Sequence, residues 1–310
     1  MKIAVLIMST LEEPSTRNIN AMKNTFIKYV NENEMIHSYD FYFYYAKRDN
    51  GEEFDCKLEQ ESENVYNVYI NTDESIYRTF EKTYYTLYSN ALEMYDYYIR
   101  ANISSFINFK LFDLIAEKLD KEIVYCNAIN AIIDSDMYNN EIYPRGDFFC
   151  FSKKIRDDIK ENMKSLIMED SNLKGRTDVI HVDDCLMGIS LLNTYGNEYG
   201  DKIKMIKYSF LPGNDIKTVN KFSISSRVKT VPPDKGYSGY SWDDNEFRKI
   251  DVNKMEMLDN YVRLTKYEQD PTLENILENE NTCRPVICIN YKSIPVATVK
   301  NYLKTKKRGI

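Results

Sequence analysis

The sequence holds few of the residues on which common catalytic and metal sites depend. Its 310 residues include only two histidines, His37 and His181, and one tryptophan. Two histidines exclude a histidine-rich zinc site and leave little basis for Ser/His/Asp catalysis. The six cysteines form no Cys-x-x-Cys pair and lie mostly in apolar runs, which favours reduced, buried thiols. Only Cys283 and Cys288 are close enough in sequence to be considered for a metal or a disulfide.

Glycine and long apolar runs are scarce as well. The 10 glycines form neither Gly-x-Gly-x-x-Gly nor a Gly-x-x-x-x-Gly-Lys-Ser/Thr loop, so the commonest nucleotide fingerprints are missing. The apolar run at residues 3–8 is too short for the core of a signal peptide, and no stretch reaches the roughly 18 apolar residues of a membrane span. A net charge of −7 argues against general nucleic-acid binding. We therefore expect a cytoplasmic protein without a membrane span.

Short apolar runs alternate with helical patterns along most of the chain. Strands are predicted at Lys2–Met8, Val65–Ile70 and residues 40–45, 95–100, 122–127, 147–152 and 203–208. Helices are predicted at residues 18–30, 74–93, 109–119, 153–168, 183–192 and 252–264. This alternation is typical of an α/β fold with a mostly parallel sheet and helices on both faces.

The alternation of strands and helices ends near residue 211. Residues 1–211 are predicted to form the nucleotide-binding domain, and the turn-rich residues 212–310 a lid, an acceptor side or a packing extension of the same domain. Ligands of parallel α/β sheets bind at the carboxyl ends of the strands. We therefore expect a nucleotide cleft bordered by residues 8–17, residues 100–105 and Gly146.

Three segments carry a resemblance to known enzymes. The first is ESIYRTFEKT at residues 74–83, followed by YDYYIR at residues 95–100. The second is YPRGDFFCFS at residues 143–152, and the third is HVDDCLMG at residues 181–188. In this order they resemble the β-1,3-galactosyltransferase and Fringe-like glycosyltransferases of the GT-A type, over roughly residues 60–195. The resemblance implies a GT-A-like fold and a nucleotide-sugar donor.

The same resemblance implies roles for an acidic pair. By its position in the family motif, Asp184 would be the general base of an inverting transfer to a carbohydrate or glycosylated acceptor, and Asp183 would orient it or cap the helix. The residues support this interpretation because a positioned carboxylate can deprotonate an acceptor hydroxyl. A plain helix cap is the alternative, since carboxylates favour helix N-termini.

The sequence departs from the family at the metal-binding motif. Where these enzymes carry Asp-Asp-Asp after a strand, this chain has Asn102-Ile103-Ser104. Hard divalent cations prefer carboxylates, so we expect no metal site of the family type and no required cofactor, although Mg²⁺ or Mn²⁺ could arrive with the diphosphate.

Basic residues would then replace the metal charge on the leaving diphosphate. The predicted donor-binding residues are Arg17, Lys82, Arg100, Asn102, Ser104, Arg227 and Lys229. For each cation alone, a solvated surface charge is the alternative, except for Arg100, which ends a buried strand and needs a partner.

Acceptor binding is predicted at two places. Arg145, Gly146 and Asp147 lie at the cleft, where a glycine just before a strand allows close backbone approach. Tyr240 and Trp242 stand beside carboxylates in a turn-rich loop and could form a sugar platform or pack the loop on the core.

Two other functions compete with glycosyl transfer. A degenerate relative that binds a sugar or a partner without catalysis would explain the loss of the triple-Asp motif. A different nucleotide-dependent α/β enzyme, such as a nucleotidyltransferase, would need a carboxylate pair on one strand, which we do not find. The sequence does not indicate the donor sugar, the acceptor or the oligomeric state.

Overall fold

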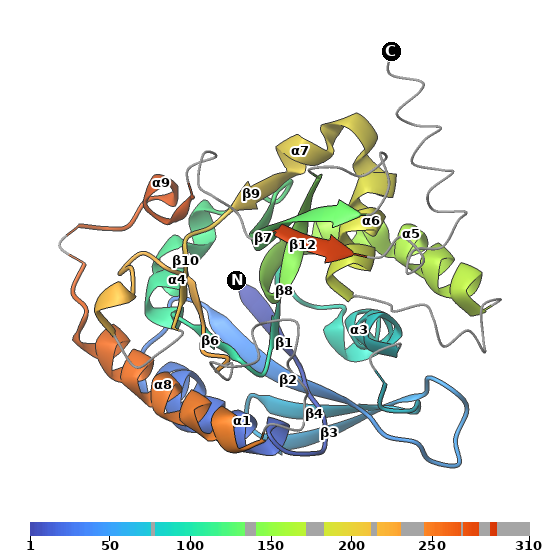
Figure 1. Ribbon diagram of the computed structural model, residues 1–310, viewed down its shortest axis with the longest axis horizontal. Helices are drawn as coiled ribbons and strands as arrows, with labels where there is room; N and C mark the ends of the chain where they lie inside the picture. Colours follow the sequence, from blue (N-terminus) through green and yellow to red (C-terminus); the bar gives the residue numbers. More distant parts are fainter. Residues whose placement is uncertain are drawn as a thin grey trace.

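The computed structural model describes residues 1–75, 78–133, 141–171, 183–211, 216–230, 245–267, 269–278 and 286–289. Of these, residues 128–133, 141–143, 168–171, 183–185, 245–247 and 286–289 are described by their backbone alone. The centre is a nine-stranded sheet in the order β12-β7-β8-β5-β1-β2-β4-β3, with β9 beside β7 (Figure 1). Its strands are β1 (Lys2–Met8), β2 (Ser38–Ala46), β3 (Cys56–Ser62), β4 (Val65–Ile70), β5 (Tyr97–Asn102), β7 (Val124–Ile133), β8 (Glu141–Ser152), β9 (Ile203–Met205) and β12 (Val286–Ile289).

The sheet is mostly parallel, as the alternation of strands and helices predicts. Strands β4, β2, β1 and β5 run parallel to one another, and β7 is parallel to β9 and β12. Strand β8 runs antiparallel between β5 and β7, and β3 is antiparallel to β4. The α/β fold class is therefore confirmed, with two reversed strands.

The burial of β1 on both faces explains why its sequence is continuously apolar. Ile3, Val5 and Ile7 belong to the core on one face of the sheet, and Ala4 and Leu6 to the core on the other. All five are at most 1% exposed, so both faces are covered. A strand buried on both faces loses the polar alternation that marks a half-exposed strand.

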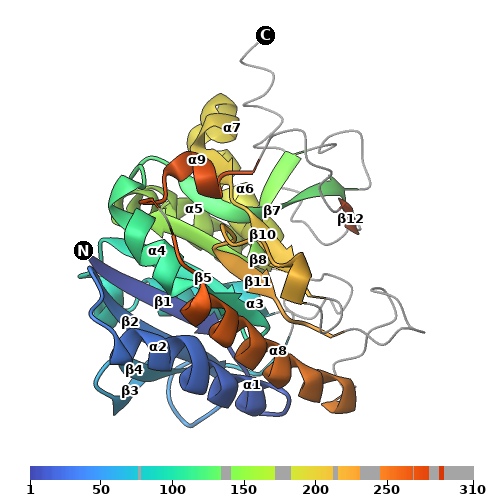
Figure 2. The same ribbon diagram turned by 90° about the vertical axis from the view of Figure 1, so that its left-hand side faces the viewer.

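Helices cover both faces (Figures 1 and 2). One layer contains α1 (Ser15–Met22), α2 (Lys28–Glu32), α4 (Phe109–Ile115) and α8 (Asn245–Leu264). The other contains α3 (Thr79–Leu87), α5 (Lys153–Ser171) and α6 (Asp183–Tyr195). The short helices α7 (Tyr199–Lys202) and α9 (Leu273–Ile276) lie near β9. Among the described helices, none is long and apolar enough to cross a membrane.

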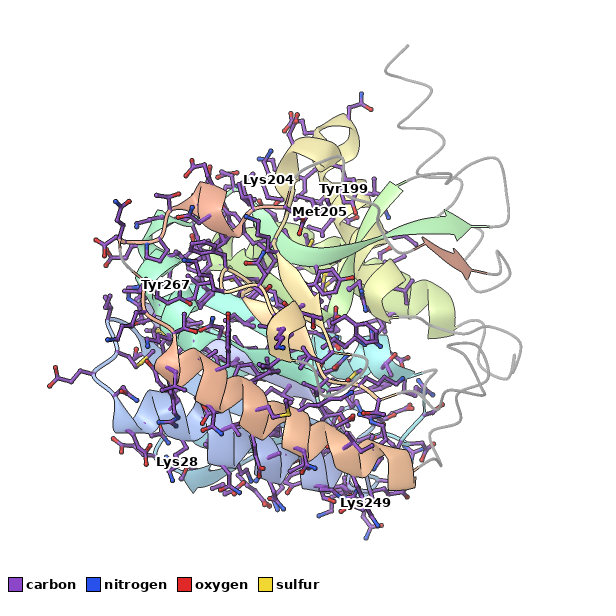
Figure 3. The ribbon with its side chains drawn as sticks, turned by 60° about the vertical axis from the view of Figure 1, so that its left-hand side comes forward. Lys28, Tyr199, Lys204, Met205, Lys249 and Tyr267 are labelled. Atoms are coloured by element: carbon purple, nitrogen blue, oxygen red, sulfur yellow. The ribbon has the colours of Figure 1, made fainter. Side chains whose placement is uncertain are left out.

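A second, three-stranded sheet continues from the carboxyl end of β5. It has the order β10-β11-β6, built from β10 (Tyr208–Phe210), β11 (Ser225–Arg227) and β6 (Ser105–Ile107). Tyr267, labelled in Figure 3, fixes the chain after α8 beside this sheet. Its hydroxyl accepts a hydrogen bond from Asn108 Nδ2 at 3.2 Å and donates to the Lys221 carbonyl at 3.1 Å.

Several element boundaries differ from the sequence-based expectations. The helix predicted over residues 74–93 is wrong in length, because α3 begins at Thr79 and ends at Leu87, before a 3₁₀ turn at Asn90–Leu92. The strand predicted at residues 203–208 is two strands, since the backbone N–H of Lys207 turns away to the Ile276 carbonyl at 2.7 Å. Strand β8 starts at Glu141 rather than residue 147.

The helix predicted over residues 18–30 is interrupted by a π-helical turn at Lys23–Ile27. Thr25 leaves helical geometry there, and its Oγ1 donates to the Ala21 carbonyl at 2.7 Å. Such back-bonding by a β-branched hydroxyl residue commonly bends a helix. Helix α8 begins at Asn245, earlier than the predicted residue 252, and contacts α1. A domain division at residue 211 stays a prediction.

Candidate functional site

The carboxyl ends of β1 and β5 meet the middle of the antiparallel strand β8 at Arg100. In the β1–β5 pairing Met8 lies opposite Asn102, and Arg100 on β5 is only 1% exposed. One guanidinium nitrogen donates to the Gly146 carbonyl on β8, and the other lies 3.4 Å from Met8 Sδ. The structure therefore brings the segments around Met8, Arg100 and Gly146 together, and gives two of the three guanidinium nitrogens of Arg100 a partner.

Gly146 corrects one detail of the sequence-based prediction. It was expected just before a strand, yet it lies inside β8. The strand continues through Pro144, Arg145 and Gly146, residues that in sequence resemble a turn. The Gly146 carbonyl accepts a hydrogen bond from buried Arg100, so this part of β8 helps to hold the Arg100 side chain in place.

The turn after β5 is closed by the side chain of Asn102. Its Oδ1 accepts hydrogen bonds from the Ser104 backbone N–H at 3.0 Å and from Ser104 Oγ at 2.9 Å. Ser105 Oγ is 3.1 Å from the same oxygen and 2.6 Å from the Asp147 carbonyl, so its single proton goes to the closer acceptor. An amide oxygen offers two lone pairs, and both are used inside this turn.

A buried carboxylate lies between two arginines beside this turn. Asp147 on β8 is 2% exposed, and its Oδ2 is 3.1 Å from Arg145 Nη2 and 3.7 Å from Arg227 Nη1. Arg227 belongs to β11, where it pairs with Ser105 of β6. The Arg145 guanidinium also lies 5.4 Å from the centre of the Tyr208 ring. Strand β8 of the main sheet and strand β11 of the small sheet thus place Arg145, Asp147 and Arg227 together.

Lys229 lies two residues beyond Arg227 in a strongly cationic environment. Burial lowers the pKa of Lys229 to about 7, and repulsion from Arg227 and Arg248 adds to this effect. Asp251 acts in the opposite direction. A lysine with this pKa is partly neutral near pH 7, and an anion placed beside it would restore its charge.

Behind Lys229, a buried polar network ties α8 to the chain after β11. Arg248 Nε donates to Asp251 Oδ2, and Asp251 Oδ1 accepts from the Thr230 backbone at 2.8 Å and from Thr230 Oγ1 at 2.7 Å. Lys254 Nζ donates to the Leu211 carbonyl at 2.7 Å and to Thr230 Oγ1 at 3.0 Å.

Sequence reasoning missed this network, although a signal for it exists. Positions 248, 251, 255, 258 and 262 recur at helical spacing, and the last three are core residues. Arg248 and Asp251 are therefore charged residues at core positions of an amphipathic helix, where burial requires a partner.

Lys82 and Arg17 lie beside the carboxyl end of β1 with partners of their own. Lys82 is 2% exposed, and its Nζ donates to the Ser9 carbonyl at 3.1 Å and to Glu74 Oε1 at 2.8 Å. Arg17 is in α1 and lies 3.2 Å from Glu13. A donor-binding role for Arg17 and Lys82 stays a prediction.

Four predicted site residues cannot be placed by their side chains. Helix α6 begins at Asp183, as the sequence predicts, but the side chains of Asp183 and Asp184 lie outside the described part of the chain. Tyr240 and Trp242 also lie outside it.

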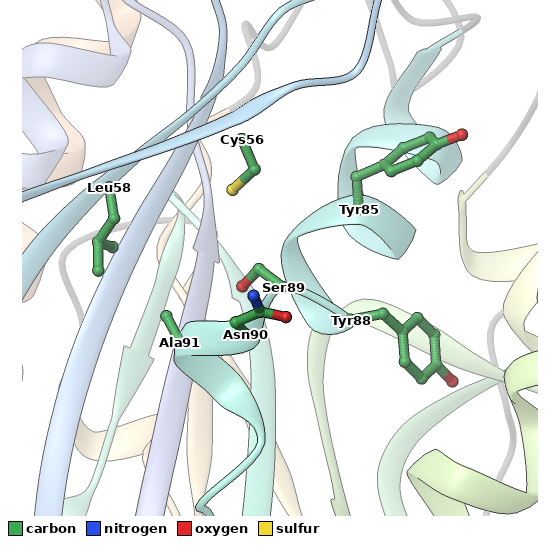
Figure 4. A pocket seen from close by; sticks show the side chains of 7 residues that line it. All are labelled: Cys56, Leu58, Tyr85, Tyr88, Ser89, Asn90 and Ala91. Carbon is green, nitrogen blue, oxygen red and sulfur yellow. The ribbon is translucent and has the colours of Figure 1, made fainter.

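A cavity of about 690 Å³ lies apart from these residues, between β3 and the end of α3 (Figure 4). Its lining residues are Cys56, Leu58, Tyr85, Tyr88, Ser89, Asn90 and Ala91. Desolvation raises the pKa of the Cys56 thiol to about 11, although the residue as a whole is exposed. The thiol is therefore protonated at neutral pH and is not an activated nucleophile.

No protein-family model matches the chain, and no curated protein matches it. Among solved structures, it is similar to a glycosyltransferase involved in the glycosylation of the major capsid of PBCV-1, with 10% identity and a TM-score of 0.39 over 82% of this chain and 99% of the other. It is also similar to the galactosyltransferase LgtC in complex with donor and acceptor sugar analogs. The identity is 12% and the TM-score 0.43, over 86% of this chain and 98% of the LgtC chain. Likenesses this distant do not carry chemistry over to this chain.

Proposed function

We propose that this protein is a glycosyltransferase that moves a sugar from a nucleotide-sugar donor to a carbohydrate or glycosylated acceptor. One observation carries the proposal. Arg145, Asp147 and Arg227 converge beside the turn at the carboxyl end of β5, within the region where ligands of parallel α/β sheets bind. The resemblance of residues 60–195 to Fringe-like glycosyltransferases points to the same edge of the sheet.

The proposed reaction is an inverting displacement at the anomeric carbon. Asp184 takes the proton of an acceptor hydroxyl as that oxygen bonds to the anomeric carbon. The bond from this carbon to the diphosphate oxygen breaks at the same time, and the electron pair leaves with the nucleoside diphosphate. Asp183, at the start of α6, would orient Asp184 or cap the helix.

The family's divalent metal does not fit the residues at the β5 turn. Asn102 and Ser104 supply no carboxylate, and the Asn102 oxygen already accepts two hydrogen bonds from Ser104. We propose instead that protein cations stabilise the leaving diphosphate, with Arg227 and Lys229 as its main contacts. Guanidinium groups suit this task because their paired donors match phosphate oxygens.

Nucleotide binding tests the proposal. Titration calorimetry is carried out with a panel of nucleoside diphosphates, nucleotide sugars and free nucleosides. For one nucleobase, the nucleoside diphosphate and the nucleotide sugar should bind, and the free nucleoside should bind more weakly. Arg227→Ala should weaken diphosphate binding more than nucleoside binding, whereas Arg263→Ala, on the outer part of α8, should change neither. Failure of every nucleotide to bind would refute the proposal, and binding without transfer or hydrolysis would favour the non-catalytic alternative.

A further inference from the structure

Two buried side chains at the junction of the two sheets have polar atoms that make no hydrogen bond among the described residues. Asp147 has no hydrogen bond to either carboxylate oxygen, although its two arginines lie nearby. Asn127, 1% exposed on β7, donates from Nδ2 to Ser225 Oγ at 2.8 Å, while its Oδ1 accepts nothing. Turning the amide over would satisfy the oxygen and leave the nitrogen unmatched, so one atom lacks a partner either way.

Both side chains lie against the same face of β11. Ser225 and Arg227 are two residues apart in this strand, so their side chains point the same way. Ser225 contacts Asn127, and Arg227 contacts Asp147. Strands β7, β8 and β11 therefore bring the two unsatisfied groups to one place between the sheets.

The chemistry of this place fits hydroxyl groups better than it fits phosphate. A carboxylate accepts hydrogen bonds and repels another anion, whereas the neighbouring arginines only donate. A sugar hydroxyl does both, because it can donate to Asp147 or Asn127 and accept from Arg145. A buried polar group without a hydrogen bond destabilises the folded protein, and a ligand that supplies that hydrogen bond would recover part of the lost free energy.

The position beside Arg227 favours the donor sugar over the acceptor. In a nucleotide sugar the ring is bonded directly to the diphosphate, and Asp147 Oδ2 is 3.7 Å from the Arg227 guanidinium proposed to contact that diphosphate. We propose that Asp147 and Asn127 bind hydroxyl groups of the sugar to be transferred and determine which sugar is accepted. This assignment rests on the proposed function, and it moves Asp147 from the acceptor to the donor.

The test compares two ligands on the same variants. Dissociation constants are measured by calorimetry for the nucleotide sugar bound best by the wild type and for its parent nucleoside diphosphate. Asp147→Asn should weaken nucleotide-sugar binding about tenfold, the effect of one lost charged hydrogen bond. Binding of the nucleoside diphosphate should stay the same or improve, since a nearby negative charge is removed. Asn127→Ala should weaken nucleotide-sugar binding in the same selective way.

Asp113→Asn is the matched control. Asp113 is another buried carboxylate, but it accepts hydrogen bonds from Tyr39 and from the Ile36 and His37 backbone, at the amino end of β2. Replacing Asp113 should leave the ratio of the two dissociation constants, for the nucleotide sugar and for the nucleoside diphosphate, unchanged. Thermal unfolding verifies that each variant is folded. Equal losses for both ligands in Asp147→Asn, or a change only in the KM for the acceptor, would overturn the assignment. If the wild type bound neither ligand, the proposed function itself would be wrong.

Discussion

Among single side chains, Asp184 has the most demanding task in the proposed reaction. Its backbone lies in the first turn of α6, where the helix dipole favours a carboxylate. Replacement by Asn keeps the shape and removes the base, so we expect kcat to fall about 100-fold or more while nucleotide binding survives. Steady-state transfer assays on Asp184→Asn and Asp183→Asn check this. A large loss of kcat in Asp183→Asn alone would mean that Asp183 is the base and Asp184 the orienting residue. No loss of kcat in either variant would show that the resemblance of residues 181–188 to the family motif is wrong.

Lys229 predicts a pH dependence of donor binding. Its pKa is lowered to about 7 by burial and by Arg227 and Arg248, against the attraction of Asp251. The cation that attracts a diphosphate is therefore present below pH 7 and lost as the pH rises through that value. The nucleotide-sugar Kd should rise between pH 7 and 8.5, approaching about tenfold per unit for one linked proton.

Calorimetry on the wild type and on Lys229→Gln measures this linkage. A nucleotide sugar is the right probe because its doubly esterified diphosphate does not titrate in this range. The variant should bind more weakly at pH 7 and show a flat profile. A wild-type Kd that does not change with pH would show that Lys229 does not contact the diphosphate.

At the scale of elements, α8 depends on a buried ion pair rather than on its apolar face alone. The side chains of Arg248 and Asp251 are 1% and 0% exposed, and Asp251 also holds Thr230. Removing one partner leaves a buried charge without compensation, which costs about 3–5 kcal/mol. Asp251→Ala should therefore lower the free energy of unfolding by about this amount in urea titrations.

Asp259→Ala on the same helix provides the comparison. Asp259 pairs with the partly exposed Arg263 at 2.7 Å, an arrangement that contributes about 1 kcal/mol or less. Similar losses in the two variants would mean that the buried network does not hold α8 in place.

Elements differ in how well the sequence predicts them. Strands β1 and β4 have their predicted bounds because an apolar run marks a buried strand directly. Strand β3 was missed, since all seven of its residues are exposed and no apolar pattern remains. The extra length of β8 was missed because Pro144 and Gly146 resemble turn residues, and only pairing with β7 overrides that preference.

The site could be predicted only in part, for a similar reason. The strand-end rule placed Arg100 and Gly146 at one edge, and their contact confirms that placement. Asn127 and Asp251 were not predicted, because each is identified only by its contact with a residue distant in sequence. Asn127 contacts Ser225, about 100 residues away, and Asp251 contacts Thr230, about 20 residues away. A single sequence carries no record of such pairings.

For the whole molecule, the proposed cation-based site predicts tolerance to chelators. Within the described residues, no group of three or more His, Cys, Asp or Glu side chains could hold a metal ion. If Arg227 and Lys229 supply the positive charge, sugar transfer or diphosphate binding should largely survive EDTA. Assays with EDTA, followed by added Mn²⁺ or Mg²⁺, measure this. Complete loss in EDTA with recovery in Mn²⁺ would show that a metal is retained.

The edge strand β3 affects how copies of this protein meet at high concentration. In the described residues it pairs only with β4, so its outer backbone groups could template a strand from another molecule. Lys57, Glu59 and Glu61 lie along it, joined to each other or to Lys23 by ion pairs at 2.5–2.7 Å. A second β3 would have to bring the same charges alongside them. This edge should therefore resist the strand-by-strand stacking that leads to fibrillar aggregates.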